Sequence, residues 1–155
     1  MTKRRWIAPI CCLVWAASIF ATSSTVITPH AFFAWCHENI FQDDAVFREF
    51  QIFWGVSWFI IVKGWHVLEF AILMLLGTLV IDALTARRNV GNALAAAALC
   101  LAYAASDEWH QTFVPDRGGI FSDVLIDSLG VILTGLYLYR GRRSLAPPAV
   151  QQFRN

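Results

Sequence analysis

The sequence SDEWHQTFVPDRGGIFSDVLIDSLG, residues 106–130, decides how the rest of the chain is organised. Five of the chain's eleven acidic residues lie in it: Asp107, Glu108, Asp116, Asp123 and Asp127. It connects two strongly apolar segments, residues 93–105 and 124–139. Charged side chains at the ends of apolar helices are costly to bury, and in a membrane they mark functional sites by default. The stretch therefore predicts a polar site where two apolar helices meet.

The composition identifies the whole chain as an integral membrane protein. Hydrophobic residues make up 57% of its 155 residues. Charged residues make up 15%, whereas soluble domains typically have about 25%. The length suits a single domain over residues 1–155. A net charge of +1 gives no reason to expect a nucleic-acid partner, and the four cysteines, of which only Cys36 lies in a polar segment, do not form a disulfide framework.

Four apolar segments of about 17 to 20 residues predict transmembrane helices. They cover residues 6–24, 65–84, 92–108 and 122–140. The first segment follows a basic N-terminus and is also consistent with a cleaved signal peptide, so both interpretations stay open.

A fifth helix is expected between the first and second spans. Residues 46–62 are rich in aromatic side chains and amphipathic, with charged residues at both ends, which favours an interfacial or re-entrant helix on the outer side. A full span is the alternative. Residues 23–41 are expected to form an irregular polar loop. The predicted fold class is therefore an all-α integral membrane protein with four transmembrane helices plus one extracytoplasmic interfacial or re-entrant amphipathic helix.

Positive charge predicts the orientation in the membrane. Lysine and arginine cluster in residues 3–5, 87–88 and 140–143, which fall on one side of four spans. The positive-inside rule makes that side cytoplasmic. Both termini are then cytoplasmic. Asp82, near the inner end of the second span, is expected to pair with Arg87 or Arg88.

This topology brings three helix ends together on the outer face, where polar residues are concentrated. The candidate binding residues are His66, Glu69, Asp107, Glu108, Gln111, Arg117, Asp123 and Asp127. Spacings of three or four residues place partners such as Asp107 and Gln111 on one helix face. Arg117 is expected to join carboxylates from two helices, because a guanidinium can engage two carboxylates through its planar fork.

The cluster has two interpretations. It is either a hydrogen-bonded clamp that locks the helix ends or a site for a lipid headgroup, phosphate or cation. No spacing typical of a metal site is present, and we expect His66 to be satisfied by a carboxylate rather than by a metal. No serine or cysteine stands beside a base as a nucleophile, so no catalytic residue and no cofactor is assigned.

The motif D-E-W-H-Q-T-F-V-P-D-R, followed by D-V-L-I-D-S-L-G, resembles the signature of the VanZ-like membrane protein family. The family pattern falls on Asp107, Glu108, Gln111, Phe113, Pro115, Arg117, Asp123, Asp127 and Gly130. Lys63-x-x-His66-x-x-Glu69 resembles the family's entry to its second span. Ser23-Ser24 resembles the polar exit of its first span, which favours an uncleaved first helix. Asp127 stands where asparagine is commoner in the family.

The resemblance implies a multi-pass protein of the bacterial cytoplasmic (inner) membrane and cell envelope, with membrane lipids as partners. The family is named for a protein associated with low-level resistance to the glycopeptide teicoplanin. We therefore expect a protein linked to antibiotic resistance that binds a lipid or its headgroup at the polar site. Two alternatives stay open: an intramembrane hydrolase or transferase acting on a lipid headgroup, and a structural subunit of an envelope complex.

Overall fold

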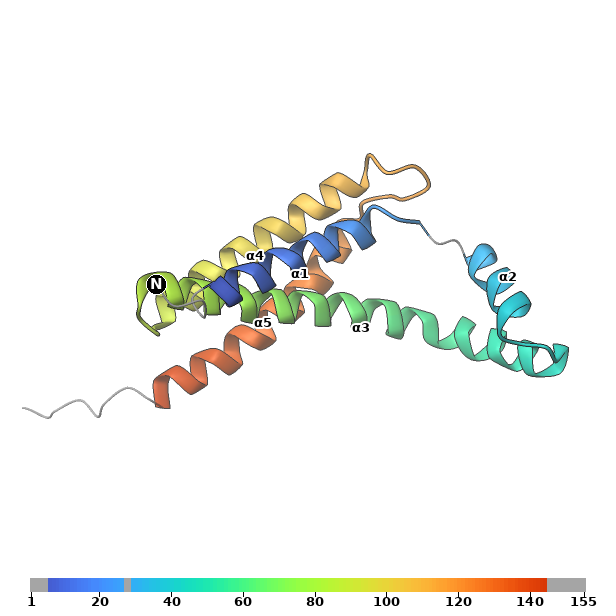
Figure 1. Ribbon diagram of the computed structural model, residues 1–155, viewed down its shortest axis with the longest axis horizontal. Coiled ribbons are helices and arrows are strands. Elements are labelled where there is room, and N and C mark those ends of the chain that lie inside the picture. The colour runs from blue at the N-terminus through green and yellow to red at the C-terminus, as the bar shows by residue number, and fades with distance from the viewer. Residues whose placement is uncertain (1–5, 27–28, 145–155) are drawn as a thin grey trace, which may run out of the picture.

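A computed structural model describes residues 6–26 and 29–144, and within these residues the chain is helical and contains no strand. The helices are α1 (Ile7–Ser23), α2 (Pro29–Asn39), α3 (Asp44–Thr85), α4 (Val90–Gln111) and α5 (Phe121–Ser144). Figure 1 shows α1, α4 and α5 alongside one half of α3, while α2 lies beside the other end of α3. The predicted all-α fold class is confirmed.

The long helix α3 corrects the predicted helix boundaries. It runs without interruption for 42 residues, so the separate interfacial helix expected over residues 46–62 is wrong. The expected break at Lys63 and Gly64 is absent because one glycine inside a helix costs only about 1 kcal/mol. At 1.5 Å per residue α3 is roughly 63 Å long, about twice the hydrocarbon thickness of a bilayer.

The helix α2 corrects a second expectation, because residues 23–41 are not an irregular loop throughout. Aromatic rings hold α2 against the start of α3: the ring centroids of Phe32 and Trp54 are 4.9 Å apart, and those of Phe33 and Phe50 are 6.1 Å apart. Aromatic pairs at such distances stabilise helix contacts beyond their buried area.

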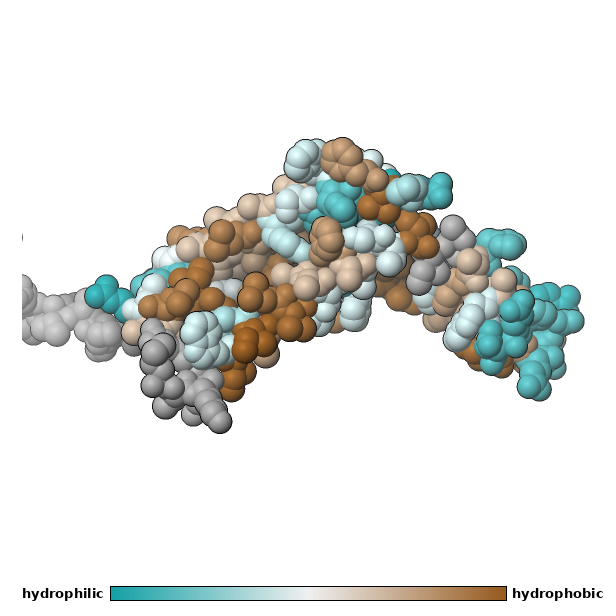
Figure 2. Space-filling view, turned by 45° about the horizontal axis from the view of Figure 1, so that its top comes forward, coloured by the Kyte–Doolittle hydropathy of each residue, from teal (hydrophilic) through white to brown (hydrophobic). Residues whose placement is uncertain are grey.

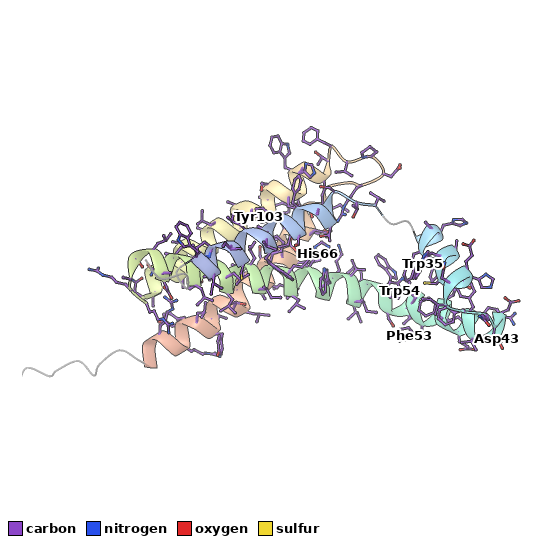
Figure 3. All side chains as sticks on the ribbon, viewed as in Figure 1. Trp35, Asp43, Phe53, Trp54, His66 and Tyr103 are labelled. Carbon is purple, nitrogen blue, oxygen red and sulfur yellow. The ribbon has the colours of Figure 1, made fainter. Side chains whose placement is uncertain are left out.

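We call α2 and residues 44–62 of α3 the arm. It extends beyond the ends of the other helices (Figure 1), and Figure 3 shows Trp35 and Trp54 together on it. Its far end is hydrophilic in Figure 2, whereas brown apolar residues cover much of the bundle. Cys36 is 2% exposed on α2.

The helix α5 approaches α3 closely at Gly130. A Cβ atom at this position would overlap the carbonyl oxygen of Val67 and lie 2.8 Å from the amide nitrogen of Ala71. Only glycine allows two backbones to approach in this way. The contact brings His66 and Asp127, each within one helical turn of it, to facing positions on α3 and α5.

The short helix α1 is fixed to the bundle by side chains that bind backbone oxygens. The indole Nε1 of Trp15 donates to the carbonyl oxygen of Glu69 at 2.9 Å, and the hydroxyl of Tyr103 donates to that of Ala16 at 2.7 Å. Between the helices lies a core that includes Phe70, Met74, Ala96, Ala104 and Val131. The first apolar segment is therefore an integrated part of this bundle.

Asp82 pairs with a different arginine from the two expected. Its carboxylate lies 2.7 Å from the Nη2 atom of Arg142 on α5 and accepts a hydrogen bond from the amide of Asn92 at 2.9 Å. Arg87 and Arg88 lie near Asp82, but among the described residues neither forms an ion pair with it. The ion pair instead ties α3 to α5.

Three helices are long and apolar enough to cross a membrane among the described residues: α3, α4 and residues 121–142 of α5. The helix α1 is apolar but shorter. These helices agree with the apolar segments seen in the sequence. The number of spans and their orientation remain predictions.

Candidate functional site

One end of the bundle gathers the predicted site residues, and we call it the polar end. There the last turns of α1 and α4 and the first turns of α5 meet the middle of α3. The structure brings all eight predicted residues to this end, on three helices and the loop between α4 and α5. Figure 3 marks the position of His66, near α1. Thr22, Ser23 and Lys63 also contribute, although the candidate list from the sequence does not contain them.

A chain of hydrogen bonds connects α1, α4 and the loop. The hydroxyl of Ser23 donates to Asp107 Oδ1 at 2.6 Å, and Gln111 Nε2 donates to Asp107 Oδ2 at 2.8 Å. Arg117 Nε then donates to Gln111 Oε1 at 2.9 Å. Both oxygens of a carboxylate that is 5% exposed are thus occupied. The expected shared face of Asp107 and Gln111 is confirmed.

Arg117 does not hold carboxylates, so that expectation is wrong. Its Nη1 atom donates to the carbonyl oxygens of Thr22 at 3.1 Å and Thr25 at 3.0 Å. Carbonyl oxygens at the end of a helix lack intrahelical donors and carry partial negative charge, which makes them good acceptors for a cation. Arg117 therefore fastens the loop to the end of α1. Its Nη2 atom has no hydrogen-bond partner among the described residues.

The two acids of α5 pair with basic side chains of α3. Lys63 Nζ lies 2.7 Å from both oxygens of Asp123, and His66 Nδ1 lies 3.3 Å from Asp127 Oδ1. A carboxylate thus lies beside His66 as expected, but no hydrogen bond joins the two side chains, and Asp127 Oδ1 is buried without a hydrogen-bond partner among the described residues. Lys63 was missed as a site residue, although its spacing of three from His66 places both on one face of α3.

Glu108 holds the loop against the end of α4. Its Oε2 atom accepts a hydrogen bond from the backbone N–H of Ile120 at 2.8 Å. A Cβ atom at Gly119 would overlap the carbonyl oxygen of Glu108, so this close return of the chain depends on glycine. Glu108 Oε1 is buried and receives no donor from the described residues.

A small cavity lies in the middle of the polar end. Its volume is about 130 Å³, and it is lined by Ile19, Thr22, Ser23, Trp65, His66, Glu69, Asp107 and Arg117. Pockets for drug-sized ligands usually measure about 300–1,000 Å³. The cavity has room for a small polar group and excludes a molecule as large as a glycopeptide.

The polar end carries more acid than base. Two of its basic side chains, Lys63 and His66, pair with the α5 acids, and Arg117 binds carbonyl oxygens. The three remaining acids, Glu69, Asp107 and Glu108, therefore contact no basic side chain among the described residues. Within those residues, no group of three or more histidine, cysteine or acidic side chains is placed to hold a metal ion.

Apolar helices long enough to cross a membrane, with a charged cluster where they meet, make this chain a multi-pass membrane protein. The family model VanZ/LLP1 matches residues 8–143. The chain therefore belongs to the VanZ/LLP1 family, as the motif around Arg117 predicts. The match includes every residue of the polar end. No curated protein and no solved structure matches the chain.

Proposed function

We propose that this protein binds the headgroup of a membrane lipid in the cavity of the polar end. Through this binding it contributes to low-level resistance to teicoplanin-type glycopeptides in the bacterial inner membrane. The observation that carries the proposal is the cavity itself: Glu69 and Asp107 line it without a basic partner, and Arg117 lines it with one nitrogen unused. Membership of the VanZ/LLP1 family supports the link to resistance.

The charges of the cavity favour a headgroup that carries both signs. An ammonium group would be attracted to Glu69 and Asp107, and a phosphate to the Nη2 atom of Arg117. Guanidinium groups bind phosphate through strong charge-assisted hydrogen bonds. Phosphatidylethanolamine has both groups, and its ammonium is small. The volume of the cavity excludes the antibiotic, so resistance would act through the lipid.

Lipid binding by the purified full-length protein tests this function. We expect native mass spectrometry to show retained phosphatidylethanolamine, and Glu69→Gln to weaken its binding about tenfold, the effect of losing one charge-assisted contact. Asp116→Asn is the matched control, because Asp116 is an exposed acid of the loop between α4 and α5 that does not line the cavity. Equal lipid retention by a folded Glu69→Gln variant and the wild type would refute the proposal.

One contact favours a second function, the hydrolase or transferase. The sequence indicated no serine beside a base, but Ser23 Oγ lies 2.6 Å from Asp107 Oδ1, and both residues line the cavity. In such a reaction Ser23 Oγ would attack the headgroup phosphorus, and its proton would pass to Asp107 and from there to the departing headgroup alcohol. Water or an acceptor alcohol would then attack the same phosphorus and break its bond to Ser23 Oγ, with Asp107 taking the attacker's proton and Ser23 recovering its own.

Release of a labelled headgroup separates the two functions. An enzyme would release the headgroup from labelled lipid, and Ser23→Ala would stop the release while the lipid still binds. A binding protein would retain intact lipid with no release. A structural subunit of an envelope complex would instead co-purify with a partner protein in fixed stoichiometry.

A further inference from the structure

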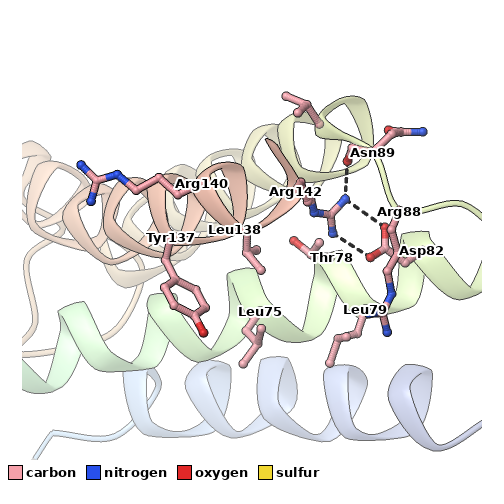
Figure 4. Close-up of a pocket in the computed structure, with 12 residues that line it drawn as sticks. Leu75, Thr78, Leu79, Asp82, Arg88, Asn89, Tyr137, Leu138, Arg140 and Arg142 are labelled. Carbon is pink, nitrogen blue, oxygen red and sulfur yellow. Dashed lines mark hydrogen bonds and ion pairs between the residues drawn. The ribbon is translucent and has the colours of Figure 1, made fainter. Parts of the chain in front are cut away.

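A second and larger cavity lies at the opposite end of the bundle, which we call the basic end. It measures about 860 Å³ and is formed where the end of α3, the start of α4 and the end of α5 meet. Arginines and leucines dominate its lining: Arg88, Arg140, Arg142, Leu75, Leu79 and Leu138 (Figure 4). This volume lies within the range of pockets that bind small molecules, about 300–1,000 Å³.

The three arginines of this cavity are in different states. Arg142 is neutralised, because its two terminal nitrogens lie 3.2 and 2.7 Å from the oxygens of Asp82 and it also binds the carbonyl oxygen of Asn89. Arg88 and Arg140 are exposed, and neither pairs with a carboxylate among the described residues. The cavity therefore presents two unneutralised positive charges and no acid that is free to accept an ammonium group.

An apolar groove continues from this cavity along α3 and α5. It measures about 370 Å³ and is lined by Ala71, Ile72, Leu75, Leu133, Thr134 and Tyr137. Leu75 and Tyr137 line both hollows, so the groove and the cavity are neighbours. The two helices touch at Gly130 and diverge towards the basic end (Figure 1). This divergence opens the groove between them.

We propose that the basic end binds one anionic phospholipid. Its headgroup lies in the mouth of the cavity, which Arg88 and Arg140 flank on opposite sides (Figure 4), and one acyl chain lies in the groove past Leu75 and Tyr137. The positive charge at the mouth of the cavity suits the anionic headgroup of such a lipid, and the apolar groove suits its acyl chain. Arginine binds phosphate in a bidentate manner, and basic side chains near a membrane surface attract anionic lipids. This site is separate from the polar end and does not depend on the function proposed there.

A binding experiment with three probes tests the proposal. Purified full-length protein in detergent is titrated with phosphatidylglycerol, phosphatidylcholine and inorganic phosphate, and bound lipid is measured by native mass spectrometry. We expect phosphatidylglycerol to bind much more tightly than phosphatidylcholine, and phosphate alone not to compete with it. Competition by phosphate at similar concentration would show a free-anion site and overturn the lipid proposal.

Variants locate the site. Replacing Arg88 and Arg140 together by glutamine should weaken phosphatidylglycerol binding about 30-fold, the combined effect expected for two basic residues. Arg87→Gln is the matched control, because Arg87 belongs to the same loop and carries the same charge but does not line the cavity. Leu75→Trp, which fills the groove, should also weaken lipid binding. Unchanged phosphatidylglycerol affinity in either folded variant would overturn the proposal.

Discussion

The hydroxyl of Ser23 lies 2.6 Å from Asp107 Oδ1, and this contact joins the end of α1 to the end of α4 across 84 positions of sequence. The last turn of α1 and the residues just after it supply the carbonyl oxygens of Thr22 and Thr25 that bind Arg117. The polar end is therefore complete only when α1 is present. This dependence distinguishes a membrane helix from a signal peptide that is removed after export.

We predict that the mature protein retains α1. Cleavage after Ala21 would remove most of this helix and leave Tyr103 without its acceptor, the carbonyl oxygen of Ala16. Intact-mass measurement of the protein purified from membranes checks the prediction. A mass that corresponds to a chain beginning after Ala21 would contradict it.

The ion pair of Lys63 and Asp123 should act as a unit, since both side chains are mostly buried, with 21% and 16% of their surface exposed. Removing one partner of a buried pair leaves an uncompensated charge and typically costs about 3–5 kcal/mol. The residual exposure lowers our expectation to about 2 kcal/mol for Lys63→Ala. The double variant Lys63→Ala/Asp123→Ala should lose less than the sum of the single variants. Strict additivity of the unfolding free energies in detergent would contradict this coupling.

Arg117→Lys should behave like Arg117→Ala. Arg117 donates to three acceptors in fixed directions, from Nε and Nη1, and a lysine ammonium cannot reproduce that planar arrangement. We expect each variant to lose about 2 kcal/mol of stability. A hydrogen bond to a charged group usually contributes about 1.5–3 kcal/mol, and here only the bond from Nε is partly buried, whereas the two from Nη1 are exposed and contribute little.

A double-mutant cycle identifies the partners of Arg117. Substitution of Gln111 by alanine should be non-additive with Arg117→Ala, because the two side chains share a hydrogen bond. Neutralising Asp123 should be additive with it, since Asp123 pairs with Lys63 instead. The reverse pattern would restore the carboxylate-bridging role that the sequence suggested.

Gly130→Ala should destabilise the bundle, because the new methyl group would overlap the carbonyl oxygen of Val67. Overpacking of this kind typically lowers the free energy of unfolding by about 1–3 kcal/mol, and we expect a clash with backbone atoms to fall at the upper end of that range. Gly64→Ala is the matched control: it lies inside α3 with no atom within 4 Å of its added Cβ, and it should stabilise the helix by about 0.5–1 kcal/mol. Thermal unfolding in detergent measures both. A neutral Gly130→Ala variant would contradict the close contact of α3 and α5.

The orientation can be read from cysteines placed at the two ends of the molecule. Native Cys36 is buried and would label poorly. The four native cysteines of the protein are therefore replaced first. A cysteine at Glu38, an exposed position of the arm, should react with an impermeant maleimide added outside intact cells. A cysteine at Arg88 should not react, because the positive-inside rule predicts that this position lies in the cytoplasm. Labelling at position 88 but not at position 38 would show that the protein has the opposite orientation to the one predicted.

The amino-acid sequence by itself determined what depends on local geometry. Apolar length predicted the helices at residues 6–24, 92–108 and 122–140. The i, i+4 spacing predicted the contact of Asp107 with Gln111, because the pitch of an α-helix fixes which side chains share a face. The motif around Arg117 indicated the family, which the match over residues 8–143 confirms.

Only the tertiary structure decided which elements meet and at what rotation. Arg117 binds the end of α1 rather than carboxylates, and Asp82 binds Arg142 rather than its neighbours in sequence. Such pairings depend on how closely two helices approach, and the glycine at position 130 sets that distance for α3 and α5. The groove at the basic end follows from the same contact, since helices that touch at one point must diverge elsewhere. The periodicity of side chains along one helix gives no information about the angle at which that helix crosses another. No pattern within a single helix therefore predicts the crossing angle.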